Sequence, residues 1–569
     1  MIEKMTRYDF ILPSGMKDGF LESLRELGVV DITRSSKPVD TRSEEMLGQI
    51  TALKDEIRCI RRLTDPRLEE LKARRSELLQ EAAATEPWGS FDKEKLEAAG
   101  VKVRYYSIQE KRFDPVWEEQ FALCEVERKD GMVWFVVLGD DEFPIKENAA
   151  PARSIDMINA ETAEYDKAIA GHTEELKARE DELPALEARM SELQSDLSLY
   201  LAGKTGETAA EDALTLFCGF APEEEDARLC AAFDEMEMVY LKDAATVEDN
   251  PPISFRNNRF VKMFELLTDM YGRPAYDGFD PTPYISVFFL LFFAMCIGDM
   301  AYGLLLAVIG LLLRKSAKFA KFAPLVVTLG LGTAVVGFFF HTFFSIDISQ
   351  WSCIPDALKA IMVPATIAGY DGTMILALIV GVVHLLLAMV VKTVYATRNK
   401  GFKYSLSTWG WTLFWLGLVI IGIAALAGVL DKAVTRFAII ALGCICAIGI
   451  FPLNNPERNV FANIGSGLWD AYNMATGILG DVLSYLRLYA LGLAGAMLGL
   501  AFNQLALDAL GDGGFGWIPF VLIAVIGHTL NIAMAALGAF VHPLRLNFLE
   551  FFKNSDYEGV GLKYDPLKK

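Results

Sequence analysis

Three titratable side chains stand inside apolar segments near the C-terminal end of the sequence, namely Arg487, His542 and Arg545. A charged group within a membrane helix is costly, so its default interpretation is a functional site with a water-filled cavity or a charged partner nearby. Arginine stays protonated at any accessible pH, which makes Arg487 a fixed positive charge. Two simpler interpretations stay open: a buried structural ion pair for Arg487, and for Arg545 a side chain that reaches the lipid headgroups.

Other polar side chains fall on helix faces near these charges. One stripe has spacings of 3, 8 and 3 residues and consists of Asp470, Asn473, Asp481 and Ser484. Arg487 lies about 240° around the helix from Asp481, so the two need not form an ion pair. A second stripe has spacings of 3, 4, 3, 4 and 3 residues and consists of His528, Asn531, Ala535, Gly538, His542 and Arg545. Each stripe predicts one polar face on a membrane helix.

The segments that hold these residues are long and apolar. Hydrophobic residues make up 52% of the 569 residues and the mean hydropathy is +0.28, which indicates membrane spans. Apolar runs cover about 284–313, 322–345, 373–393, 409–429, 434–452, 460–510 and 518–552. The first run exceeds a span of ~20 residues and is interrupted at Gly298-Asp299, which predicts two short helices that turn there. The run 460–510 must be tilted, bent or extended into water.

Charge asymmetry sets the expected number of spans. With eight helices, the basic segments 314–321 and 392–403 and the C-terminal Lys568-Lys569 all fall on the side of the N-terminus, as the positive-inside rule requires. The opposite loops hold acidic residues, Asp347, Asp356, Asp371, Asp508 and Asp512. The N-terminal residues lack the apolar core of a secretory signal. We therefore expect a multi-pass protein of a cell membrane with both termini cytoplasmic.

The first 280 residues have a different character, that of an acidic cytoplasmic arm. They carry 60 acidic and 36 basic residues, a balance that argues against nucleic acid as a partner. Heptad-like spacing predicts two long helices, within 41–85 and 155–203, that pair as an antiparallel coiled-coil hairpin. A proximal α/β lobe is expected from 1–40 with 205–260, and a distal lobe from 86–150. A dimeric coiled coil is the alternative, because sequence does not separate intramolecular from intermolecular pairing.

The arm shows no sign of an enzyme site. It contains no Walker loop, no GxGxxG at a strand-to-helix turn, and no Ser/His/Asp grouping. The eight cysteines contain no CxxC pair, and we expect them to be structural, reduced thiols. The sequence thus predicts a mostly α-helical protein with cytoplasmic α/β lobes on a coiled-coil hairpin. Residues 281–569 are expected to form an eight-helix transmembrane bundle whose seventh and eighth helices are a long tilted pair.

Four segments resemble the large membrane stator subunit of rotary V/A-type ATPases, called subunit I in bacteria and archaea and subunit a in eukaryotes. They are FRNNRFVKMFELLTDMYGRPAYDGFDPTP at 255–283, FFAMCIGDMAYG at 292–303, GDVLSYLRLYALGLAGAM at 480–497, and HPLRLNFLEFF at 542–552. The resemblance covers the chain, and its SYLRL and LRLxxxE segments are the most specific. Where the family's first membrane turn usually reads GDxGxG, this sequence has Ala301 and Tyr302 after the aspartate.

The resemblance implies a role for each polar stripe. Arg487 matches the family's essential arginine, Arg545 its second arginine, and His542 a position of His or Gln. These residues would face ring-forming proteolipid subunits, each of which bears an ion-binding carboxylate. Asp470, Asn473, Asp481 and Ser484 would line one half-channel, and His528 and Asn531 a second polar surface; the phase of the helices supports these assignments.

The resemblance also implies partners and a transported ion. The arm would bind peripheral-stalk coiled-coil subunits and the central-stalk subunit that caps the ring, while membrane lipid surrounds the bundle. The ion would be H⁺ or Na⁺, and the chain itself would need no cofactor and hold no nucleotide site. The rival hypotheses are a secondary transporter or channel with a regulatory cytoplasmic coiled coil, which predicts inverted repeats with broken helices, and a purely structural membrane tether.

Overall fold

The computed structural model describes residues 1–34, 37–91, 100, 102–129, 131–139, 143–149, 153–209, 213–316, 319–320, 322–349, 355–359, 361–364, 366–367, 369–452, 459–510 and 516–568. Lys318, Lys321, Cys353, Asp512 and Lys569 lie outside these ranges. The chain forms two compact units. Unit 1 consists of Met1–Leu12, Val29–Ile32 and Leu216–Pro566, and unit 2 of Pro13–Gly28, Thr33–Thr215 and Leu567–Lys569.

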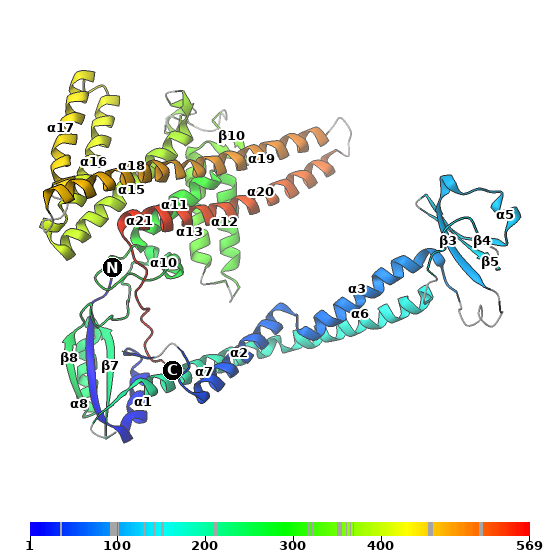
Figure 1. The fold of residues 1–569 in the computed structure, drawn as a ribbon, viewed down its shortest axis with the longest axis horizontal. Helices are drawn as coiled ribbons and strands as arrows, with labels where there is room; N and C mark the ends of the chain where they lie inside the picture. The colour runs from blue at the N-terminus through cyan, green and yellow to red at the C-terminus, as the bar shows by residue number, and fades with distance from the viewer. Residues whose placement is uncertain are drawn as a thin grey trace. The chain divides into compact units, whose positions relative to one another are not determined.

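A small antiparallel sheet begins unit 1. Its strands follow the order β2 (Asp31–Ile32), β7 (Leu214–Pro222), β1 (Met5–Pro13) and β8 (Val239–Ala244). Alternate residues of β1 point into the core, where the rings of Tyr8 and Phe10 lie 5.5 and 5.1 Å from that of Phe233. Phe233 belongs to α8 (Asp226–Glu235), so this helix covers one face of the sheet (Figure 1).

The first membrane segment is two short helices, as the sequence predicts. α11 (Thr282–Ile297) ends at Gly298, whose φ of 58° lies in the left-handed region that glycine adopts without steric cost. α12 (Met300–Leu313) begins after Asp299. The Asp299 carboxylate caps α12 by accepting the backbone N–H groups of Ala301 and Tyr302 at 2.8 and 3.1 Å. α13 (Ala323–Phe339) packs against both helices.

Longer apolar helices follow along the chain. They are α15 (Gly372–Lys400), α16 (Leu406–Leu426), α17 (Lys432–Ile450), α18 (Val460–Ser484), α19 (Leu486–Leu510) and α20 (Trp517–Arg545). Within the described residues, five helical segments are long and apolar enough to cross a membrane, and α11, α12 and α13 are shorter apolar helices. The predicted 460–510 segment is two helices, α18 and α19, that meet at Tyr485 nearly in line, with α20 beside α19 (Figure 1). The count of eight spans and the orientation of the termini stay predictions.

Pro543 lies inside α20, near its C-terminal end. Proline lacks an N–H donor, so a helix cannot keep its regular hydrogen bonds there. In this chain α20 continues into a π-helical segment (Leu546–Phe551) and then α21 (Phe552–Ser555). The Asn547 side chain donates to the Pro543 carbonyl oxygen at 2.9 Å. The π turn resets which side chains of the C-terminal segment point inward.

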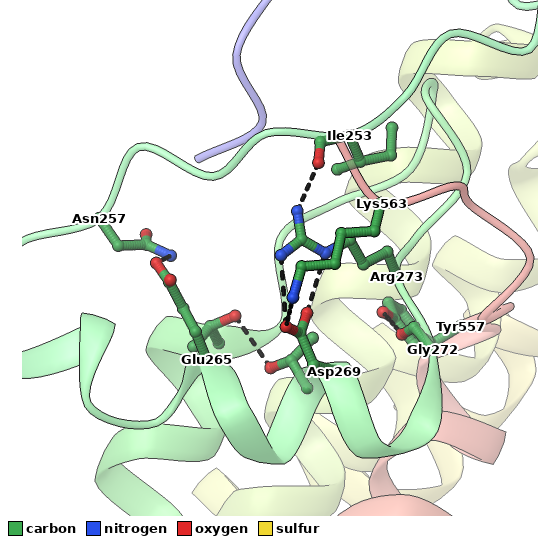
Figure 2. A network of polar contacts seen from close by, with 10 residues as sticks. Ile253, Asn257, Glu265, Asp269, Gly272, Arg273, Tyr557 and Lys563 are labelled. Atoms are coloured by element: carbon green, nitrogen blue, oxygen red, sulfur yellow. Dashed lines mark hydrogen bonds and ion pairs between the residues drawn. The ribbon is translucent and has the colours of Figure 1, made fainter. Parts of the chain in front are cut away.

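The C-terminal tail binds the segment that precedes the membrane helices. Asp269, in α10 (Glu265–Tyr271), accepts hydrogen bonds from Arg273 at 2.8 Å and from Lys563 at 2.9 Å. Arg273 also donates to the Ile253 carbonyl, and Tyr557 donates to the Gly272 carbonyl at 2.8 Å. Figure 2 shows Arg273 and Lys563 converging on Asp269 from opposite segments of the chain. The tail thus fixes the last membrane helix to the junction before the first.

Unit 2 contains the long helices of the arm. α2 (Thr41–Arg62) contacts α7 (Leu183–Thr205), α3 (Pro66–Thr85) contacts α6 (Ile155–Ala178), and α1 (Lys17–Leu27) also packs on α7 (Figure 1). Both helical stretches are interrupted beside a proline. α2 ends before Leu63, which has a φ of 51°, and α3 begins at Pro66; a 3₁₀ turn (Arg179–Glu182) precedes α7, whose second residue is Pro184. The coiled-coil pairing of these helices stays a prediction.

A three-stranded antiparallel sheet lies between α3 and α6 in the sequence. Its order is β3 (Val103–Gln109), β5 (Met132–Leu138) and β4 (Leu123–Lys129), with α5 (Trp117–Gln120) nearby. Tyr106, Phe135 and Phe143 form its core. The remaining short elements are β6 (Glu207–Ala209), α9 (Arg259–Lys262), β9 (Thr342–Phe343), β10 (Ile346–Asp347), α14 (Asp356–Lys359), β11 (Thr366–Ile367) and β12 (Tyr370–Asp371).

Candidate functional site

Arg487 lies in the first turn of α19, directly after the interruption at Tyr485. Its side chain is half-buried, and its Nη1 atom is buried without a hydrogen-bond partner among the described residues. Within that same part of the chain, Arg487 forms no ion pair, although its charge acts on His542 and Glu550. A buried donor without a partner is costly, so this part of the guanidinium raises the free energy of the site.

The two other predicted charges lie on α20, which packs against α19. His542 is partly buried and lies within range of the charges of both Arg487 and Arg545. Arg545 is exposed and, within the residues described, makes no ion pair. The structure thus brings Arg487, His542 and Arg545 into one neighbourhood from two helices, with the positive charges not neutralised by direct contact.

Asp481 pairs with a residue other than Arg487. Its carboxylate accepts hydrogen bonds from Lys553 Nζ at 3.3 and 3.4 Å and from Asn554 Nδ2 at 2.8 Å. Lys553 and Asn554 belong to α21, so the contact joins α18 to the C-terminal end of the α20 segment. This agrees with the helical phase, which separates Asp481 from Arg487.

A cavity of about 320 Å³ surrounds this ion pair, and we call it cavity one. Its polar lining comes from α15, α16, α18 and α21 and includes Lys392, Asp470, Asn473, Asp481, Lys553 and Asn554. Three of the four residues of the first predicted stripe therefore share one cavity. The fourth, Ser484, donates a hydrogen bond from its hydroxyl to the Gly480 carbonyl at 3.1 Å, and its side chain also lies close enough to Glu550 to interact with that carboxylate.

Glu550 and Asn547 are functional candidates that the sequence analysis did not single out. Glu550 is 5% exposed and its Oε2 atom has no hydrogen-bond partner among the residues described; the same is true of Oδ1 of the fully buried Asn547. Glu550 also lies within range of the charges of Asp481 and Arg487. The available signal was a carboxylate in the apolar run HPLRLNFLEFF, which by itself marks a functional hypothesis.

A second cavity, cavity two, has a volume of about 220 Å³. Its lining comes from the turn between α11 and α12, the loop after α13, and the first part of α19, and includes Asp299, Tyr302, His341, Asp371, Gly492 and Gly495. Along the helix pair, cavity one reaches Asp481 and cavity two begins at Leu488. Arg487 therefore stands between the two cavities in the sequence of this helix pair.

His528 and Asn531 take part in a hydrogen-bond network beside cavity two. The His528 ring lies 2.7 Å from the Tyr302 hydroxyl and 2.9 Å from Asn503 Oδ1. Asn531 is 1% exposed and donates to the Tyr302 hydroxyl and to the Gly495 carbonyl, both at 2.9 Å. The second predicted stripe thus holds α20 against α12 and α19 at its N-terminal half and carries His542 and Arg545 at its other end.

Among the described residues no group of three metal-binding side chains occurs, and the seven described cysteines form no disulfide. Carboxylates line both cavities, Asp470 and Asp481 in cavity one and Asp299 and Asp371 in cavity two, and carboxylates attract small cations.

The chain is similar to known rotary ATPase subunits. The model of the V-type ATPase 116kDa subunit family matches residues 219–324 and 476–569, which contain all four segments quoted above. The A-type ATP synthase subunit I of Pyrococcus horikoshii is 30% identical over 56% of this chain and 48% of its own length. The V-type ATP synthase subunits I of Chlamydia pneumoniae and Borreliella burgdorferi are 26% and 23% identical, over 92% and 100% of this chain and 86% and 100% of their own lengths. The match thus spans about half the length of the archaeal relative.

Proposed function

Because this chain belongs to the V-type ATPase 116kDa subunit family, we propose that it is the membrane stator subunit of a rotary V/A-type ATPase or ATP synthase, in which it carries H⁺ or Na⁺ past a rotating ring. The family predicted from the sequence motifs is confirmed, and the apolar helices fit a membrane protein. The nucleotide chemistry of such a complex takes place on other subunits.

The observation that carries the proposal is that Arg487 lies, along α18 and α19, between the residues that line cavity one and those that line cavity two. Arg487 is only half-buried and forms no ion pair within the described residues, so the accessible part of its guanidinium can pair with a carboxylate from outside the chain. A ring subunit that bears a carboxylate at membrane depth supplies such a group. The attraction between unlike charges is strong where water is excluded, which favours this pairing.

In the mechanism that follows, each ring carboxylate meets Arg487 and gives up its ion. The guanidinium favours the charged carboxylate and so lowers its affinity for a proton or cation. Because arginine does not deprotonate, it does not carry the ion itself. An ion that enters from cavity one therefore reaches cavity two only by travelling with the ring.

Other residues of the site take supporting roles. Asp470, Asn473, Asp481 and Ser484 provide the polar path toward the ring on one side, with Glu550 at its inner end. Arg545 and His542 add positive charge opposite the ring. His528 and Asn531 hold the helices that form the second path. The direction of transport depends on whether the complex hydrolyses or makes ATP.

The arm provides the anchor in this proposal. A stator resists the torque of the ring only if it is fixed to the rest of the complex, so the arm would bind peripheral-stalk coiled-coil subunits and the central-stalk subunit that caps the ring. The helices α2, α3, α6 and α7 would form the coiled-coil hairpin. The eight predicted spans, of which α18 and α19 together make one, would cross the membrane with both termini in the cytoplasm. The acidic arm suits basic partner surfaces.

ATP-driven ion uptake by the complex in vesicles tests this function. Arg487→Ala is expected to abolish uptake while the complex still assembles with its ring subunits, and Arg487→Lys is expected to do the same because lysine does not reproduce the planar guanidinium. Asp508→Asn, at an exposed position of α19, is the matched control and is expected to transport normally. Full coupled transport by an assembled Arg487→Ala complex would refute the proposal.

A further inference from the structure

His384 of α15 is a fully buried histidine with one satisfied ring nitrogen. Its Nδ1 atom lies 2.8 Å from the Tyr485 hydroxyl, whereas its Nε2 atom has no hydrogen-bond partner among the residues that the structure describes. An unpaired buried polar atom costs free energy, and an apolar side chain would fill this space without that cost. The bond to Tyr485 is therefore the feature that distinguishes histidine from a plain core residue at this position.

Aromatic rings from two other elements enclose the imidazole. Phe551, in the π-helical segment after α20, is stacked on it with ring centres 4.8 Å apart and an interplanar angle of 11°. Phe288 and Phe292 of α11 lie at 4.2 and 5.0 Å. One imidazole ring thus contacts α11, the junction of α18 with α19, and the segment that follows Arg545. Such ring contacts fix the relative positions of the elements that carry them.

Tyr485 is held by a second feature of α15. It is fully buried, and its ring lies directly over Gly381, where any Cβ atom would come within 2.4 Å of Tyr485 Cγ. Gly381 and His384 are three residues apart and so lie on the same face of α15. Gly381 provides the space for the ring, and His384 provides the hydrogen bond to its hydroxyl.

The geometry points to His384 as a positioning residue for the two arginines, and we propose this role on the premise of the proposed function. Tyr485 stands two residues before Arg487, and Phe551 stands six residues after Arg545. Because Tyr485 and Phe551 both contact the imidazole of His384, this side chain sets the position of Arg487 relative to Arg545. In this role, His384 touches neither the carboxylate of the ring-forming subunit nor the ion.

The test is the ratio of ions transported to ATP hydrolysed by the assembled complex in vesicles. Tyr485→Phe keeps the ring and removes only the hydroxyl, and His384→Phe keeps an aromatic ring and removes the nitrogens. Each is expected to lower the ratio about three- to tenfold, the fold-change that corresponds to one lost hydrogen bond. His384→Asn, whose amide retains a polar group near the Nδ1 position, is expected to recover part of the ratio.

The double variant of His384→Phe and Tyr485→Phe separates a shared role from two independent ones. Since both single changes break the same hydrogen bond, the double variant is expected to be no worse than either single one. Thr333→Val is the matched control, because it removes a buried hydroxyl from α13 that bonds only within its own helix, to the Leu329 carbonyl at 2.8 Å. Its ratio is expected to equal that of the unsubstituted complex.

Unchanged ratios in the assembled single variants would overturn the positioning role, and so would losses that add in the double variant. Arg487→Ala is measured in the same series. If it also transports normally, the proposed function fails; if it is inactive while Tyr485→Phe is normal, only the role of His384 fails.

Discussion

Lys553 Nζ lies 3.3 Å from Asp481 Oδ1, although the two residues are 72 positions apart. The Asp481 side chain is 13% exposed and that of Lys553 61% exposed, so the carboxylate belongs to the wall of cavity one and the ammonium to its open part. An ion pair with one exposed partner is weak and opens easily. In the proposed function, Asp481 would exchange its lysine partner for an ion that arrives through the cavity.

The first prediction concerns this carboxylate. Asp481→Asn is expected to lower ATP-driven ion uptake by about tenfold or more, because a positioned proton carrier typically contributes at least that much to rate. Lys553→Met, which removes the competing ammonium, is expected to retain uptake. Vesicle uptake assays of assembled complexes measure both. Normal uptake by Asp481→Asn would show that the ion does not pass through this carboxylate.

The second prediction concerns the pH dependence of the arm. His172 lies 2.8 Å from Asp65 Oδ2 and 3.1 Å from Glu175 Oε2, and the hydrogen bonds to these carboxylates raise the pKa of His172. A raised folded-state pKa gives stabilisation that is complete below the unfolded value of about 6.5 and is lost as the pH rises through the folded value. Contacts between α3 and α6 should therefore weaken as the pH rises above about 6.5.

Hydrogen exchange of the full chain measures this effect, since Asp65 is also the N-cap of α3 and accepts from the Leu68 amide at 2.7 Å. The amides of the first turn of α3 are expected to exchange faster at alkaline pH than the intrinsic pH dependence predicts. His172→Gln is expected to remove this excess. An equal excess in the variant would assign the pH dependence to another group.

The third prediction concerns the contact of the C-terminal tail with α10. Burial alone would raise the pKa of Asp269, but hydrogen bonds from Arg273 and Lys563 outweigh it and lower the pKa. Asp269→Asn leaves Arg273 without its charged partner, and we expect a loss of roughly 1–3 kcal/mol in stability, typical of a hydrogen bond to a charged group. Thermal unfolding of the purified protein, compared with Glu558→Gln at an exposed tail position, measures this loss.

The same contact predicts a direction with pH. A folded-state pKa below the unfolded value gives stabilisation that is present above the unfolded value of about 3.9 and is lost as the pH falls through the folded value. The difference between the unsubstituted protein and Asp269→Asn should therefore be constant from neutral to mildly acidic pH and shrink only below about pH 4. A difference that changes near neutral pH would contradict this origin.

Elements with a strong local signal could be predicted from the sequence. The helix Lys17–Leu27 has the predicted ends, because its apolar residues keep helical spacing and Gly28 ends it in the left-handed region. The turn at Gly298-Asp299 has the same origin, with a glycine that ends one helix and an aspartate that caps the next. The motifs around Arg487 and Arg545 likewise sufficed to predict the family.

Contacts made across the fold could not be predicted in this way. The helical phase indicated that Arg487 need not be the partner of Asp481, but it did not identify Lys553, which comes from a distant segment. Glu550 is part of the LRLxxxE motif, but only the fold reveals that it is buried and that it lies near Arg487. For His384, its place among leucines favoured a satisfied core histidine, and only the fold reveals that one nitrogen is paired and that the partner is Tyr485.

The most direct test of the central claim is whether cavities one and two open to opposite sides of the membrane. Gly477 lines cavity one ten residues before Arg487, and Ala496 lines cavity two nine residues after it. Gly477→Cys and Ala496→Cys are each labelled in vesicles with a membrane-impermeant thiol reagent applied from one side at a time, and the unsubstituted protein gives the background from its native cysteines. We expect Gly477→Cys to react only from the side of the arm and Ala496→Cys only from the opposite side. Reaction of both positions from the same side would contradict the separation of two half-channels by Arg487.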